Sequence, residues 1–144
     1  MPLGSGGTAA GLALGLAIAG MDTTLSCAAV APRIVANKRR VLSIARQCAR
    51  FIEHGTGATL PRVDPARITV DRDYYGGAYG RATTGGNDAA RWLLDAAGIA
   101  IDATYSAKAF AAAMAHAAND RTAGPTLFWL TYDARASITA LERV

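Results

Sequence analysis

Cysteine and histidine are scarce in this sequence, which has two residues of each in a chain of 144. Cys27 and Cys48 lie in apolar stretches without the spacing of metal ligands, so we expect two reduced, buried thiols and no disulfide framework. His54 precedes a glycine at a predicted helix end, where a cation complements the helix dipole. His116 has no second ligand four residues further along its helix. The sequence therefore predicts no metal site.

The sequence also lacks a long hydrophobic run. Its most apolar stretch, 12–19, follows several glycines, has no Lys or Arg before it and is cut short by Asp22. A secretory signal begins with a basic segment, and a transmembrane helix needs about 20 apolar residues. With 51% hydrophobic residues, the composition is that of a globular domain. We expect one domain or part of one, cytoplasmic and without a membrane partner.

Acidic residues are outnumbered by basic ones, 11 against 15, which gives a net charge of +4. Many of the basic residues lie between Arg33 and Arg50, and such a stretch can contact nucleic acid. However, no aromatic residues interleave these charges to stack on bases. Apolar residues of the same stretch recur on one face of a predicted helix, so its arginines are expected on the solvated face. We therefore predict no nucleic-acid partner.

Helical and strand patterns alternate along the chain. Apolar residues at a spacing of three or four predict helices, and short apolar or alternating runs predict buried strands. Helices are expected over 8–20, 35–53, 86–97 and 106–118, with a further short one over 134–141, and strands over 24–31, 67–70 and 126–130. Strands that alternate with helices predict an α/β fold in which helices flank a parallel sheet.

A glycine-rich loop, 4–11 (GSGGTAAG), is the strongest local motif. Glycines allow backbone N–H groups to approach an anion, and the N-terminus of the following helix favours negative charge. The loop lacks the lysine of a Walker A motif, and the strand expected over 24–31 does not end in the acid that binds a dinucleotide ribose. A single phosphate on a small cofactor fits better. The alternative is an ordinary glycine turn before an alanine-rich helix.

Four segments occur in the order in which one enzyme family has them. The loop 5–11 resembles a cofactor-phosphate loop, and 79–83 (YGRAT) resembles a GYGxPT segment. The segment 102–109 (DATYSAKA) resembles a DPxYxGK segment, and 128–131 (FWLT) resembles a closing strand that ends in threonine. Together they resemble the D-cysteine desulfhydrase / 1-aminocyclopropane-1-carboxylate deaminase family. These are pyridoxal 5′-phosphate (PLP) enzymes of fold type II, the tryptophan synthase beta-like fold, so the resemblance implies part of a large domain of that fold.

The resemblance implies that PLP is the cofactor and that a small amino acid is the substrate. PLP forms a Schiff base with the substrate amine and acts as an electron sink, and the family releases ammonia and a 2-oxo acid. Two tyrosines, Tyr79 and Tyr105, would face the substrate as catalytic residues, and Ser106 would add a polar contact. The residues implied for the cofactor are Ser5, Gly6, Gly7 and Thr8 at its phosphate and Thr131 at its pyridine nitrogen.

Several positions depart from the family segments. Alanine replaces glycine or proline near both tyrosines, and other residues replace the histidine and the glycines around the final threonine. These positions are Ala78, Ala82, Ala103, Ala107, Leu130, Tyr132 and Asp133. The substrate therefore stays open among D-cysteine, D-serine, cysteate and aminocyclopropane-carboxylate.

The Schiff-base lysine of the family lies N-terminal of the glycine loop. Here the lysines are Lys38, in a solvated basic run, and Lys108, which matches a lysine of the second tyrosine segment. We therefore expect 1–144 to be the C-terminal portion of a PLP-dependent enzyme domain, with the N-terminal half and its Schiff-base lysine absent. The alternatives are a non-catalytic truncated module that binds a phosphate or a partner, and one subunit of a split enzyme completed by an N-terminal partner chain. For the full-length family the resemblance implies a homodimer.

Overall fold

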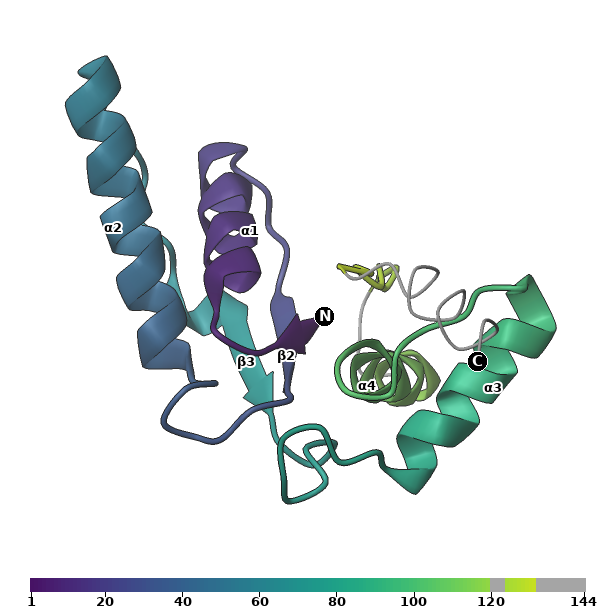
Figure 1. The fold of residues 1–144 in the computed structure, drawn as a ribbon. Coiled ribbons are helices and arrows are strands. Elements are labelled where there is room, and N and C mark those ends of the chain that lie inside the picture. Colours follow the sequence, from purple (N-terminus) through teal and green to yellow (C-terminus); the bar gives the residue numbers. More distant parts are fainter. Residues whose placement is uncertain (120–123, 132–144) are drawn as a thin grey trace, which may run out of the picture.

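A computed structural model describes residues 1–119 and 124–131 of the chain (Figure 1). Within these residues, three strands form one parallel sheet in the order β1-β2-β3. The strands are β1 (Pro2–Leu3), β2 (Leu25–Ala29) and β3 (Ile68–Asp71). Leu3 lies opposite Ala29, and Leu25 lies opposite Ile68. The parallel sheet predicted from the alternation of strands and helices is confirmed.

The helices of the same described residues are α1 (Gly7–Ile18), α2 (Lys38–Thr56), α3 (Thr84–Ala97) and α4 (Ser106–Ala118). Each coincides with a predicted helix. Helix α2 begins and ends three residues later than predicted, because local caps set its bounds. The side chain of Asn37 caps the first turn, and Gly57 ends the helix with a φ of 71°. In this part of the chain no helix is both long and apolar enough to cross a membrane.

Helices cover both faces of the sheet because successive side chains of a strand point to opposite faces. Cys27 and Ala29 of β2 belong to the larger core cluster, which includes residues of α1 and α2. Ala28, between them, packs with Ala109 and Ala112 of α4. Figure 1 shows the result, with α1 and α2 on one side of the strands and α4 on the other. The fold is therefore α/β, with helices flanking a parallel sheet.

The helices α3 and α4 pack closely against each other. The rings of Trp92 on α3 and Phe110 on α4 have centroids 6.1 Å apart. Near the start of α3, a Cβ added to Gly86 would lie 3.6 Å from backbone atoms of Ala107 and Lys108. The same Cβ would lie 2.8 Å from the hydroxyl of Thr83, which caps α3 by accepting a hydrogen bond from the Gly86 N–H. Gly86 is therefore required by both the cap and the helix contact.

The strand predicted over 126–130 is wrong. The described residues 125–131 adopt no regular secondary structure, and Leu127, Trp129 and Leu130 are exposed. The sheet edge at β1 is two residues long and includes Pro2, which has no N–H to donate. Such an edge offers few free hydrogen-bonding groups to a further strand, and the segment instead packs Phe128 onto Phe110, with ring centroids 5.1 Å apart. The helix predicted over 134–141 lies outside the described residues.

The two cysteines differ in burial. Cys27 is fully buried, as predicted, and burial raises the pKa of its thiol to about 11. Cys48 is exposed on α2, and Phe51 on the same helix is 81% exposed. The C-terminal half of α2 extends past the strands (Figure 1), so its apolar side chains have no sheet to cover them. The prediction of a buried thiol is therefore wrong for Cys48.

We expect opposite effects from alanine at two adjacent glycines of α3. Gly86→Ala should lower the free energy of unfolding by about 1–3 kcal/mol, because its Cβ overpacks the contact with α4 and displaces the Thr83 cap. At Gly85 an added Cβ meets nothing within 4 Å. Gly85→Ala should therefore raise the free energy of unfolding by about 0.5–1 kcal/mol through helix propensity. Urea denaturation measures both, and equal stabilisation by the two variants would contradict the described packing.

Candidate functional site

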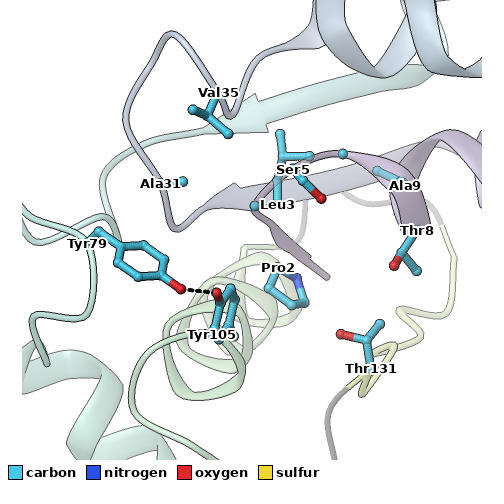
Figure 2. A pocket seen from close by; sticks show the side chains of 13 residues that line it. Pro2, Leu3, Ser5, Thr8, Ala9, Ala31, Val35, Tyr79, Tyr105 and Thr131 are labelled. Carbon is cyan, nitrogen blue, oxygen red and sulfur yellow. Dashed lines mark hydrogen bonds between the residues drawn. The ribbon is translucent and has the colours of Figure 1, made fainter.

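A cavity of about 370 Å³ lies at the carboxyl ends of the strands. Its walls come from the glycine loop after β1, from Ala31 and Val35 after β2, and from the segment after β3 that carries Tyr79 (Figure 2). Seven of the eight residues that the sequence analysis named for the site line it: Ser5, Gly6, Gly7, Thr8, Tyr79, Tyr105 and Thr131. Ala31 and Val35 were not predicted. The signal for them is their position directly after β2, because ligands of parallel sheets bind outside the carboxyl ends of strands.

The glycine loop and the residues that begin α1 line the cavity with their backbone. The first hydrogen bond of α1 runs from the Ala10 N–H to the Gly6 carbonyl, at 2.9 Å. The N–H groups of Gly7, Thr8 and Ala9 therefore precede the helical hydrogen-bond pattern. Within the described residues, α1 has no side-chain cap and no acidic residue in its first turn. An anion in the cavity would satisfy these donors and complement the helix dipole.

Glycine is required at position 6 and leaves open space at position 7. Gly6 is buried and has a φ of 96°, a left-handed conformation that strains other residues. A Cβ added there would lie 3.5 Å from the side chains of Val41 and Ile44 on α2. A Cβ added at Gly7 would meet nothing within 4 Å. The loop is thus supported from behind by α2 and open at Gly7, which fits a bound phosphate group.

Tyr79 and Tyr105 meet across the cavity. Tyr79 belongs to the segment after β3, in which Gly77 and Gly80 on either side have positive φ angles. Tyr105 directly precedes α4. Their hydroxyl groups form a hydrogen bond, and their rings meet edge to face with centroids 6.0 Å apart (Figure 2). Two phenols that are 26 positions apart in the sequence therefore form one polar group at the cavity wall.

The environment of Tyr105 favours its protonated form. The hydrogen bond with Tyr79 raises the pKa of the Tyr105 phenol above its usual value, and burial and the charges of Tyr79 and Asp102 act in the same direction. Asp102 also fixes the start of α4, because its carboxylate accepts from the N–H groups of Tyr105 and Ser106 at 2.6 and 3.0 Å. The phenol of Tyr105 therefore keeps its proton at neutral pH, and the backbone of the residue is held in place by Asp102.

Lys108 links the two elements that carry the tyrosines. It is fully buried on α4, and its Nζ donates to the Tyr75 carbonyl at 2.8 Å. The ammonium also lies 5.7 Å from the centroid of the Tyr75 ring, and burial lowers the pKa of Lys108. Among the residues that the structure describes, Lys108 is outside the set that lines the cavity. Its position indicates that it holds the Tyr79 segment against α4.

Ser106, which the sequence suggested as an additional polar contact, is buried beside the site. Its Oγ has no hydrogen-bond partner within residues 1–119 and 124–131, and it is not among the residues found to line the cavity. His116, further along α4, forms a 3.0 Å hydrogen bond between its Nε2 and the Oγ of Ser26 on β2. In the described part of the chain, no three His, Cys, Asp or Glu side chains gather into a metal-binding group.

No family model matches the sequence. The structure is similar to the crystal structure of an ACC deaminase homologue. The two share 27% sequence identity with a TM-score of 0.59, over 77% of this chain and 31% of the other. The chain therefore spans about a third of the length of that protein. The likeness agrees with the fold implied by the four sequence segments and supports, at that level, the fold-type-II family of PLP-dependent enzymes.

Removal of one tyrosine hydroxyl tests the pairing of Tyr79 and Tyr105. Tyr79→Phe deletes the largest cause of the raised pKa, so the pKa of Tyr105 should fall toward the usual tyrosine value of about 10. Because the folded-state pKa is raised, the stability contributed by this hydrogen bond is present at neutral pH and lost as the pH rises through that pKa. The ¹³Cζ shifts of the tyrosines, recorded as a function of pH, measure the change.

Tyr74→Phe is the control for this experiment. Tyr74 lies in the same segment but packs against Ala28 and α4, away from the hydrogen bond between Tyr79 and Tyr105. This substitution should leave the titration of Tyr105 unchanged. A Tyr105 pKa that is equal in the wild type and in Tyr79→Phe would show that the two hydroxyls do not interact in solution.

Proposed function

We propose that this chain forms the phosphate-binding loop and the tyrosine wall of the active site of a cytoplasmic PLP-dependent lyase or deaminase. The observation that carries the proposal is the cavity in which uncapped N–H groups of α1, the Tyr79–Tyr105 pair and Thr131 come together. The similarity to an ACC deaminase homologue supports the same class of enzyme. The proposed reaction converts a small amino acid into ammonia and a 2-oxo acid.

The residues present fit the proposed cofactor. The N–H groups of Gly7 and Thr8 would bind its phosphate, with hydroxyl groups of Ser5 and Thr8 as further donors. Thr131, which also lines the cavity (Figure 2), would offer a neutral hydroxyl to the ring nitrogen. When bound, PLP supplies an electron sink for the amino acid.

The tyrosine pair would handle a proton at the Oη of Tyr105. A phenol with a raised pKa is a proton donor at neutral pH, and a cation bound nearby would lower that pKa and allow the phenol to release its proton. Tyr79 orients this hydroxyl through its hydrogen bond. A group that both holds and releases a proton beside the substrate is what elimination of a β-substituent or opening of a small ring needs.

We infer that the catalytic lysine is supplied from outside residues 1–144. A PLP-dependent lyase requires a lysine for its Schiff base. Neither Lys38 nor Lys108 is among the described residues that line the cavity, and Lys108 is occupied by the Tyr75 carbonyl. An N-terminal partner chain or an N-terminal half of the same protein would provide this lysine, and assembly as a homodimer belongs to the same proposal. The second candidate function, a phosphate-binding module without catalysis, rests on the same uncapped loop.

Ligand binding tests the loop without requiring catalysis. Pyridoxine 5′-phosphate has the cofactor's ring and phosphate but no aldehyde, so it cannot react with lysines. Calorimetry should show tighter binding of pyridoxine 5′-phosphate than of pyridoxine, because only the former reaches the donors of α1. Thr8→Val should lower the affinity for pyridoxine 5′-phosphate by about fivefold, because one hydroxyl donor is lost.

Thr84→Val is the matched control. Thr84 is exposed and begins α3, away from the residues that line the cavity. The Thr84→Val variant should bind pyridoxine and pyridoxine 5′-phosphate with the affinities of the wild type. Equal affinity of the wild type for pyridoxine and its phosphate would refute a phosphate site at the loop.

An activity assay separates the enzymatic proposal from the binding module. The chain alone, given PLP and D-cysteine, D-serine, cysteate or aminocyclopropane-carboxylate, should release no 2-oxo acid, because it lacks a lysine at the cavity. Addition of a lysine-bearing N-terminal partner should restore release. Turnover by the chain alone would contradict the need for an external lysine.

A further inference from the structure

The first turn of α2 carries an unusual charge pattern. Lys38, Arg39 and Arg40 are consecutive there, and the turn has no acidic residue. Cations at a helix N-terminus oppose the helix dipole and destabilise the helix slightly. The helix dipole therefore does not favour these three residues at this end of α2.

Arg40 contacts the glycine loop directly. Its Nε donates a hydrogen bond to the carbonyl of Ser5 at 2.9 Å, across 35 positions of sequence. Lys38 donates instead to the Pro65 carbonyl at 3.0 Å. The side chain of Arg39, between these two residues, is exposed and forms no hydrogen bond among the described residues. Of the three cations, Arg40 is thus the one joined to the loop.

The backbone of Arg40 is itself held in place. Asn37 caps α2 by accepting a hydrogen bond from the Arg40 N–H at 2.9 Å. The amide group of Asn37 also donates to the carbonyls of Arg33 and Ile34, at 3.0 and 3.1 Å. The turn after β2 and the start of α2 therefore form one fixed unit from which the Arg40 side chain reaches the loop.

The contact determines the orientation of one peptide group. In a planar trans peptide the carbonyl and the following N–H point in opposite directions, and no peptide of the described chain is cis. Because Arg40 binds the Ser5 carbonyl, the Gly6 N–H is directed away from Arg40. Gly6 is buried, and the side chains of Val41 and Ile44 on the same helix lie next to its Cα. Both Ser5 and Gly6 line the cavity.

We propose that Arg40 is a positioning residue for phosphate binding. It draws the Ser5 carbonyl oxygen, which would repel an anion, away from the ligand and directs the Gly6 N–H toward it. It also places a permanent positive charge next to the loop, which attracts a phosphate. This inference rests on the proposed phosphate site. It adds to that site a residue, Arg40, that lies outside the glycine-loop motif.

The test compares two arginines of the same helical turn. Arg40→Gln should weaken binding of pyridoxine 5′-phosphate to the full chain by about tenfold, the size expected for one charge-assisted hydrogen bond. Arg39→Gln removes the same charge from the same end of α2 but breaks no contact with the loop, and it should change the affinity by less than about twofold. Arg40→Lys, which keeps a charge and a donor, should retain most of the affinity. Binding of unphosphorylated pyridoxine should be equal in all four proteins.

Each other outcome has a distinct meaning. Equal effects of Arg40→Gln and Arg39→Gln would overturn the role of Arg40 while leaving the phosphate site intact. An equal loss of both ligands in Arg40→Gln would show that Arg40 only supports the fold, and it would also overturn the inference. A wild type that does not prefer the phosphorylated ligand would refute the proposed function itself, and with it any positioning by Arg40.

Discussion

The candidate site depends on the common direction of the three described strands. Since β1, β2 and β3 are parallel, the chain leaves each of them at the same edge of the sheet. The glycine loop, the turn with Ala31 and Val35, and the Tyr79 segment therefore meet at that edge, although they are far apart in sequence. An antiparallel neighbour would send one of these segments to the opposite edge, and no cavity with this set of residues would form.

A second level of order comes from polar contacts that hold the loops at this edge. The Asp102 carboxylate caps α4 and fixes Tyr105. Buried Lys108 holds the Tyr75 carbonyl and so determines where the segment with Tyr79 begins. On the other side, Arg40 holds the Ser5 carbonyl of the glycine loop. Loops that carry functional groups are thus positioned by contacts to helix starts, which the core of the sheet keeps rigid.

Much of this fold could be predicted from the sequence because its signals are local. The spacing of apolar residues predicted the helix Ser106–Ala118, and the glycine loop preceded a helix as expected. The strand predicted over 126–130 failed because a strand needs a partner edge, and its own residues say nothing about one. The residues of the site were predicted by resemblance to a family. The Tyr79–Tyr105 and Arg40–Ser5 hydrogen bonds could not be, because each joins segments whose proximity exists only in the folded chain.

The burial of Lys108 makes the reactivity of its amine a measure of local opening of the structure. Of the two lysines in the sequence, Lys38 is half-buried at the N-terminus of α2, whereas Lys108 is fully buried between α4 and the Tyr75 segment. An amine-reactive reagent reaches Lys38 in the native state but reaches Lys108 only when the Tyr75 segment separates from α4. The acylation rate of Lys108 is therefore a measure of how often the tyrosine wall opens, since local opening precedes modification of a buried group.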